Sequence, residues 1–282
     1  MQKIKTFFRL SRKNPQMRIG LFLLAILALI AVFGPLLAPF DPKELRGDLL
    51  MAPGQNGYVL GTDGLGHDLL SELLYGARTS LQIGFIAAMI SALIGTAVGG
   101  IAGFYGGITD KILNEVMNIF LMIPSFFLIL LIVAIFGSSM LNVMIVIGLT
   151  SWVGNARLMR AQAISLKSRT FILGAQAMGE GRAAILWKHI IPNGIFPIIA
   201  NTTMNISGAI LSEAGLAFIG LGDPNVISWG QIINAGKTYL PKCWWITTFA
   251  GAMVVFTVLT FYLIGDGLTK ILSPKMDAAN NN

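Results

Sequence analysis

The sequence predicts an all-α integral membrane protein with six transmembrane helices and both termini in the cytoplasm. Three observations lead to this fold class. Of the 282 residues, 55% are hydrophobic and only 12% are charged, whereas an ordinary soluble domain has about 25% charged residues. Long runs contain no ionisable side chain, and about 20 such residues are enough to cross a bilayer. Lys and Arg gather between alternate runs, as expected for cytoplasmic loops.

The expected spans cover residues 19–40, 81–105, 116–136, 140–156, 194–222 and 244–265. The first run follows a basic leader, but it exceeds the 7–15 apolar residues of a signal peptide, so we expect a retained helix. Residues 116–156 form one uncharged stretch that is too long for a single span. We therefore divide it at Gly137-Ser138-Ser139, a sequence typical of a helix break.

The distribution of positive charge sets the expected orientation. With the N-terminus in the cytoplasm, all but five of the 20 Lys and Arg residues fall on the cytoplasmic side, the exceptions being Lys43, Arg46, Arg78, Lys237 and Lys242. The net charge of +7 is then explained by topology, so we expect no nucleic-acid partner.

The external side should carry an amphipathic surface helix and aromatic anchors. Residues 68–81 place leucines at helical spacing, which predicts a helix lying on the outer surface before the second span. Trp229, Trp244 and Trp245 are expected at the outer interface, where tryptophan is enriched.

Residues for catalysis, metal binding or nucleotide binding do not form recognisable sets. The single cysteine, Cys243, excludes an intramolecular disulfide, and His67 and His189 are expected on opposite sides, which argues against a histidine-based metal site. Gly236-Lys237-Thr238 resembles the end of a phosphate-binding loop, but Gln231 stands where that pattern needs glycine. Energy for active transport would have to come from another polypeptide.

The cytoplasmic segment between the fourth and fifth spans contains an interrupted helix. Residues 158–178 suit one helix, Gly179-Glu180-Gly181 breaks it, and a short second helix should end at Pro192. Its spacing predicts one apolar face, formed by Ala183, Leu186, Trp187 and Ile190, opposite Arg182 and Lys188. Such a segment could dock on a partner protein or rest on lipid headgroups.

Polar residues of the fifth span form a candidate pathway. Asn201, Asn205, Gly208 and Ser212 recur at three- to four-residue spacing and share one helix face. They could line a water-filled path or form hydrogen bonds between packed helices. Glu213, in the outer half, could meet a substrate ammonium group or hold a pair of helices together.

Four blocks of the sequence carry a family resemblance: residues 60–84, 104–125 and 210–233, and the segment in which Ala175, Gly179 and Pro192 match the motif of the EAA coupling loop. On these residues the chain resembles the second permease subunit of the ATP-binding-cassette importers for dipeptides, oligopeptides and nickel. Some positions depart from the family pattern: Leu173 replaces the motif glutamate and Gly174 its first alanine. Glu115, Asn118 and His67 stand where arginine, aspartate and arginine are usual.

The resemblance implies a type I importer permease: a five-helix core at residues 79–272, preceded by residues 1–78 with the first helix and followed by a cytoplasmic tail at 273–282. It implies that the coupling loop, 157–193, contacts an ATPase subunit through Ala175, Gly179, Glu180, Arg182, Ala183, Leu186, Trp187, His189 and Pro192. The chain itself would hold no cofactor, since ATP and Mg bind the ATPases.

The implied partners are a homologous permease subunit, two cytoplasmic ATPases, an extracytoplasmic substrate-binding protein and the lipid bilayer of the cell membrane. Peptides are the expected cargo, with nickel or a nickel chelate as the alternative. A stand-alone secondary transporter would call for inverted repeats and paired intramembrane ions, and a membrane-embedded enzyme for a catalytic constellation. Neither pattern is evident in the sequence.

Overall fold

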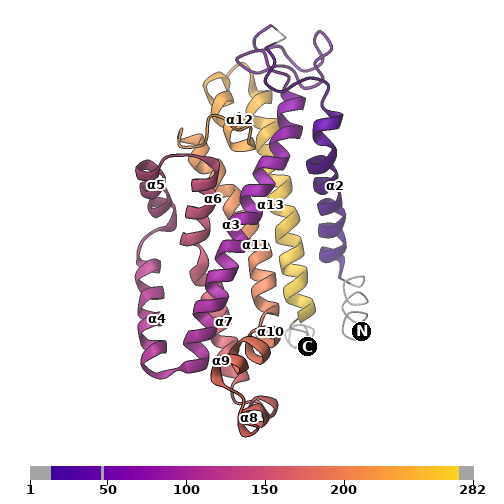
Figure 1. The fold of residues 1–282 in the computed structure, drawn as a ribbon. Helices are drawn as coiled ribbons and strands as arrows, with labels where there is room; N and C mark the ends of the chain where they lie inside the picture. Colours follow the sequence, from indigo (N-terminus) through magenta and orange to yellow (C-terminus); the bar gives the residue numbers. More distant parts are fainter. Residues whose placement is uncertain (1–13, 46–47, 273–282) are drawn as a thin grey trace, which may run out of the picture.

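A computed structural model describes residues 14–45 and 48–272, and every regular element in that part of the chain is a helix. Four helices are long and apolar enough to cross a membrane: α2 (Pro15–Leu37), α3 (Leu69–Tyr105), the nearly continuous α6 (Met140–Thr150) and α7 (Trp152–Leu166), and α13 (Trp244–Leu272). Two bent helix pairs bring the number of possible spans to six. Figure 1 shows these helices side by side, with α12 (Trp229–Gly236) near one end and α8 (Thr170–Ala177) at the other.

The third expected span, 116–136, is not a straight helix. It is divided into α4 (Gly107–Met122) and α5 (Ser125–Phe136), which meet at an angle of 84°. Pro124 explains the break, because its ring disfavours a helical backbone at the preceding residue, and Ile123 is indeed extended. The expected break at residues 137–139 is confirmed, since α5 ends at Phe136 and α6 begins at Met140.

The prediction of a separate surface helix at 68–81 is wrong, because residues 69–81 form the first turns of α3 and Asp68 is its N-cap. Asp68 caps this helix by accepting a hydrogen bond from the backbone N–H of Ser71 (2.8 Å). Leu69, Leu73 and Ala77 are buried against protein rather than lipid. The helix continues without interruption to Tyr105, so the expected domain boundary between residues 78 and 79 falls inside it.

Trp229 and Trp245 are buried in the core and do not anchor the chain at the membrane surface as expected, whereas Trp244 is exposed. The indole N–H of Trp229 donates to the carbonyl of Leu73 (3.0 Å), and its backbone N–H donates to the Ser80 hydroxyl (3.1 Å). These bonds fix α12 against the N-terminal part of α3.

A row of glycines lets α3 approach α7 closely. Gly95, Gly99 and Gly103 recur every four residues, and a Cβ atom at any of them would collide with α7. At Gly99 and Gly103 the collision would be with the backbone carbonyls of Ala156 and Arg160, which cannot rotate away. Small residues at this spacing are typical of helices whose backbones pack tightly in a membrane.

The loops at the end of the bundle that carries α12 are also tied to it. Asp223 follows α11 (Phe196–Phe218) and accepts a hydrogen bond from the backbone N–H of Met140, the first residue of α6 (2.9 Å). Burial alone would raise the pKa of Asp223, but hydrogen bonds from Asn225 and Met140 outweigh it and lower the pKa. The short helical turn η2 (Lys237–Tyr239) then connects α12 toward α13.

The first and last described helices lie together. Near their shared end, the Lys270 ammonium group donates to the Gln16 side chain (2.7 Å) and pairs with Asp266 (2.9 Å). The expected tail, 273–282, and the first 13 residues lie outside the described part. Large apolar side chains along α2 are exposed, as expected for a surface that faces lipid (Phe22, Leu29, Val32, Leu36 and Leu37).

We predict that Gly99→Ala destabilises the bundle by about 1–3 kcal/mol, the usual cost of overpacking, because the added methyl group meets the Ala156 carbonyl. Gly251→Ala is the matched control in α13, where an added Cβ has no neighbour within 4 Å. Thermal unfolding of the purified chain in detergent measures both variants. Equal melting temperatures for the two would contradict the tight α3–α7 contact.

Candidate functional site

The candidate docking segment, residues 170–194, lies at the end of the bundle opposite α12 (Figure 1). It contains α8, then α9 (Arg182–Ile185), the π-helical turn η1 (Leu186–Ile190) and α10 (Ile191–Gly194). The prediction of one continuous helix over 158–178 is wrong, because α7 ends at Leu166 and α8 starts at Thr170. At the break, the Ser168 hydroxyl donates to the Ser165 carbonyl (3.4 Å), a local bond that competes with helix continuation.

Gly179 ends α8 in the way the sequence predicts. Its φ of +80° is a left-handed conformation that glycine adopts without strain. The backbone N–H of Glu180 donates to the Ala175 carbonyl (3.1 Å), and that of Gly179 donates to the Gln176 carbonyl (3.0 Å). This pair of bonds is a Schellman motif, so Gly179 both stops α8 and turns the chain into α9.

The apolar face expected for the second helix is only half right. Leu186 and Ile190 are buried, 1% and 0% exposed, but Trp187 is 56% exposed and Ala183 is also exposed, while Ile185 takes their place inside. The π-helical turn explains the change, because its wider winding moves side chains out of the 3.6-residue register.

The second helix was expected to end at Pro192, but it continues past this residue. Pro192 lies in the first turn of α10, which continues to Gly194 before the chain bends by 62° into α11. Proline has no backbone N–H to donate, and the first turn of a helix is where this lack is tolerated. The side chain of Asn193 donates to the carbonyl of His189 (2.7 Å), which satisfies one of the acceptors at this junction.

Glu180 holds the two halves of the docking segment together. Its carboxylate lies 2.7 Å from Nε2 of His189 and 3.9 Å from Nζ of Lys188, both in η1. Arg182 is exposed and lines a small cavity of about 190 Å³ together with Lys167, Gln176 and Tyr105. Arg182 and Lys188 therefore add exposed basic side chains to the surface of the docking segment.

Large apolar side chains are exposed on the same segment. Phe171, Leu173, Met178 and Trp187 all show substantial exposed area, while Ile172, Ala175, Ile185, Leu186 and Ile190 pack into one core cluster with Phe104 and Met159. The buried side chains attach the segment firmly to α3 and α7. Its exposed apolar side chains, alongside Arg182 and Lys188, suit contact with another protein.

Asn201 serves helix packing. Its amide donates to Oδ1 of Asn155 in α7 (2.9 Å), and the Asn155 amide donates to the Ser91 hydroxyl in α3 (3.2 Å). Asn155 is fully buried. These three residues link α11, α7 and α3, and the sequence analysis missed Asn155 because a single asparagine near a span end carries no periodic signal.

Further along the same face of α11, Asn205, Gly208 and Ser212 form no side-chain hydrogen bond to α7 within the described residues. Gly208 is exposed, and a Cβ added there would meet no neighbour within 4 Å. Ser212 is half-buried and donates to the carbonyl of Gly208 (2.8 Å). Asn205 is half-buried and forms no side-chain hydrogen bond within the described part of the chain. These three residues leave an open polar face for water, substrate or another subunit.

Glu213 ties α11 to α12. Its carboxylate is buried and accepts a hydrogen bond from the hydroxyl of Ser228 (2.7 Å), and that hydroxyl also caps α12 by accepting from the backbone N–H of Gln231 (3.2 Å). This geometry favours the role of holding a helix pair together.

Two further links bind α4 to α7. The Arg160 guanidinium forms a bidentate pair with Asp110, and Arg157 donates to Oδ1 of Asn118 (3.0 Å). Asn118 stands where the family resemblance led us to expect aspartate, and it still accepts a hydrogen bond from arginine.

Comparisons with known proteins agree along almost the entire chain. Residues 95–278 match the family described as binding-protein-dependent transport system inner membrane component, and residues 4–53 match the N-terminal transmembrane domain of oligopeptide transport permease C. The dipeptide transport system permease protein DppC of Escherichia coli is 39% identical, covering 98% of this chain and 94% of its own length.

Two other curated relatives are similarly close. The di/tripeptide transport system permease protein DppC of Pseudomonas aeruginosa is 35% identical, covering 98% of this chain and 93% of its own length. The oligopeptide transport system permease protein OppC of Bacillus subtilis is 33% identical, with coverages of 94% and 87%.

Among solved structures, an inward-facing MetNI methionine ABC transporter gives a TM-score of 0.56 at 18% identity. The match covers 71% of this chain and 96% of that one. At this identity the likeness concerns the fold alone.

We predict that Asn201→Ala lowers stability by about 1 kcal/mol, because it removes a hydrogen bond between membrane helices. Asn205→Ala, one turn further along α11, should leave the melting temperature unchanged and reduce transport if this face lines the path. Unfolding in detergent and uptake by membrane vesicles separate the two effects. A stability loss at Asn205 equal to that at Asn201 would contradict the open face.

Proposed function

The chain belongs to the family of binding-protein-dependent transport system inner membrane components, and we propose that it forms half of the path through which an ATP-driven importer carries di- or oligopeptides. The observation that carries this proposal is the similarity to dipeptide and oligopeptide permeases over more than nine-tenths of the chain. Peptide relatives favour peptides over the nickel alternative. Hydrolysis of ATP is assigned to separate subunits.

The docking segment is the proposed contact with a cytoplasmic ATPase. Trp187 and Ala183 are exposed on its surface, flanked by Arg182 and Lys188, while Leu186 and Ile190 fix the segment to the bundle. A surface that combines an exposed tryptophan with arginine is typical of protein interfaces. The Glu180–His189 contact keeps both halves of the segment in one orientation.

Movement of the docking segment would be transmitted to the proposed path because α10 is connected almost directly to α11. Only Ile195 separates α10 from α11, and α11 carries Asn205, Gly208 and Ser212 on its open face. Closure of two ATPases would move the docking segment and α11 together, as in rigid-body transitions between inward-open and outward-open states. A homologous permease subunit would supply the other wall of the path.

The proposal places both termini and the docking segment in the cytoplasm, as the distribution of Lys and Arg favours. The loop between α2 and α3, together with α12, then faces the extracytoplasmic binding protein that delivers the peptide. The permease core is proposed to span residues 79–272.

We predict that a single cysteine at Ala183, in a chain with Cys243→Ser, crosslinks to an ATPase subunit in native membranes, with a yield that changes when ATP is added. Val59→Cys is the matched control, because Val59 is also exposed but belongs to the loop between α2 and α3. Mass spectrometry of the crosslinked band identifies the partner. Capture of lipid-phase reagents at residue 183, with no ATPase crosslink under any nucleotide condition, would contradict docking and favour the interfacial-linker alternative.

The cargo is tested with the complete importer in proteoliposomes. We expect ATP-dependent uptake of a radiolabelled dipeptide or short oligopeptide when the binding protein is supplied outside. Nickel should not accumulate when it is supplied without peptide. Uptake of nickel, and none of peptide, would establish the alternative cargo.

A further inference from the structure

The loop between α2 and α3 folds back on itself at its end, and this brings Asp63 beside His67. Oδ1 of Asp63 accepts hydrogen bonds from the backbone N–H groups of Leu65 (2.9 Å) and His67 (2.7 Å). The backbone N–H of Asp63 donates to the His67 carbonyl (3.1 Å), and Thr62 pairs with Asp68 across the turn. One carboxylate oxygen of Asp63 therefore shapes the turn, while Oδ2 faces Nδ1 of His67 at 3.0 Å.

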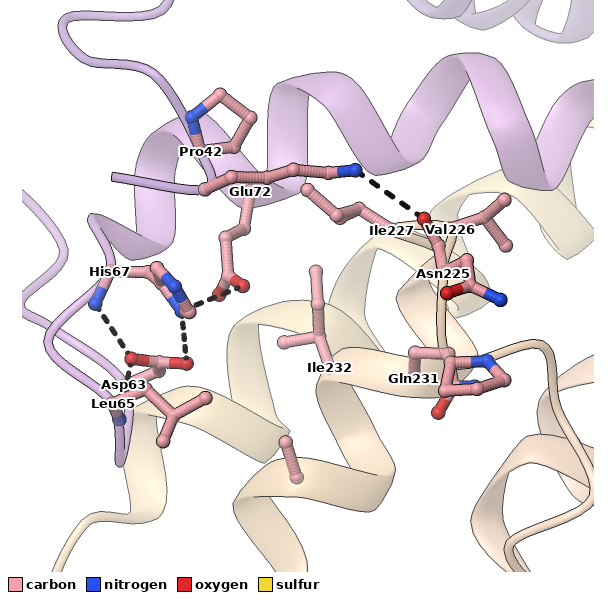
Figure 2. Close-up of a pocket in the computed structure, with 13 residues that line it drawn as sticks. Pro42, Asp63, Leu65, His67, Glu72, Asn225, Val226, Ile227, Gln231 and Ile232 are labelled. Carbon is pink, nitrogen blue, oxygen red and sulfur yellow. Dashed lines mark hydrogen bonds and ion pairs between the residues drawn. The ribbon is translucent and has the colours of Figure 1, made fainter. Parts of the chain in front are cut away.

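Glu72, in the first turn of α3, completes the group. Its carboxylate points toward His67, as Figure 2 shows, and Oε1 lies 3.8 Å from Nδ1 of the imidazole. One donor atom from each of Asp63, His67 and Glu72 lies within 4.8 Å of the other two.

The Glu72 side chain is largely buried, lines a cavity and has few partners. Glu72 is only 9% exposed, and its carboxylate accepts no hydrogen bond from the described residues. Burying a carboxylate without hydrogen bonds is costly unless a positive charge compensates it. The nearby ammonium group of Lys43 instead donates to the carbonyl of Asn225, at 3.5 Å.

The three side chains share the wall of a cavity of about 460 Å³. The loop at 224–227 and the side chains of Gln231 and Ile232 form the other walls (Figure 2). The cavity gives a bound ion access to solvent and leaves space for a further ligand.

We propose that Asp63, His67 and Glu72 bind a divalent transition-metal ion of the zinc type. One imidazole nitrogen and two carboxylate oxygens are ligands that Zn²⁺ takes, whereas Ca²⁺ and Mg²⁺ prefer oxygen alone. Metal–ligand bonds of 2.0–2.2 Å place neighbouring tetrahedral donors about 3.3–3.6 Å apart, and the two separations from His67, 3.0 Å and 3.8 Å, bracket that range. The fourth position faces the cavity and takes water.

The ion joins the turn at residues 61–68 to the first turn of α3. It therefore stabilises the outer loop above the cavity and neutralises the buried Glu72 carboxylate. The sequence analysis missed this site because it looked for histidine pairs, and one histidine with two carboxylates is sufficient. The inference does not depend on the transported cargo, since it concerns an ion that stays bound.

The test is zinc binding to the full-length chain, purified in detergent and stripped with a chelator. We expect one zinc ion per chain at micromolar zinc, measured by competition with a chromogenic chelator, and a rise in melting temperature on zinc addition. His67→Ala and Glu72→Gln should each weaken binding by about tenfold or more and remove the thermal shift. His189→Ala is the matched control, because the other histidine of the chain lies in the docking segment, and it should bind zinc like the unchanged protein.

Glu72→Gln changes the charge with almost no change of shape, so its folding can be verified by elution volume and helical content. Absence of zinc binding in the unchanged, folded protein would overturn the proposal. Binding that survives either His67→Ala or Glu72→Gln at full affinity would also overturn it, because the proposed site needs all three ligands. Loss of binding with His189→Ala would place the ion elsewhere and would likewise overturn it.

Discussion

The close approach of α3 and α7 is the constraint on which the rest of the structure depends. Gly95, Gly99 and Gly103 allow the backbone of α3 to touch that of α7, so neither helix can slide or rotate alone. The next face of α3 supports the docking segment, because Leu186 and Ile191 pack beside Gly100. The N-terminal end of the same helix carries Glu72. One continuous helix of 37 residues therefore sets the position of both candidate sites, at opposite ends of the molecule.

Polar side chains inside the bundle act mainly as links between helices. Asn155 joins α3, α7 and α11, Glu213 joins α11 to the cap of α12, and Arg160 joins α7 to α4. Each of these groups has a specific partner, and Asn155 and Glu213 are buried, as expected where water cannot compete. The face of α11 that carries Asn205, Gly208 and Ser212 differs, because these residues form no such link to another helix within the described residues. This face can therefore contact water or substrate, which makes it a candidate for lining the path.

Features set by local chemistry could be predicted from the sequence, whereas features set by packing could not. The break at residues 137–139 and the turn at Gly179 follow from glycine and serine chemistry, and both were predicted. Residues 68–81 have the pattern of a surface helix, but their leucines face protein, which periodicity cannot distinguish from lipid. The apolar face around Trp187 was misplaced because a π-helical turn has no clear sequence signal. Asp63, His67 and Glu72 meet only because a loop folds back onto a helix end.

The bends show where the chain can and cannot transmit movement. The α4–α5 pair is bent by 84° at Pro124, and α10 meets α11 at 62°, whereas α3 has no break. A bend does not by itself make a flexible joint: the α10–α11 junction is one residue long and is packed against Met159 and Gln162 at Gly194. A displacement of the docking segment must therefore move α11 as one body, or else separate Gly194 from α7. Because that contact is buried and Asn201 also binds Asn155 of α7, we expect the docking segment, α7 and α11 to move together, carrying the open polar face of α11 with them.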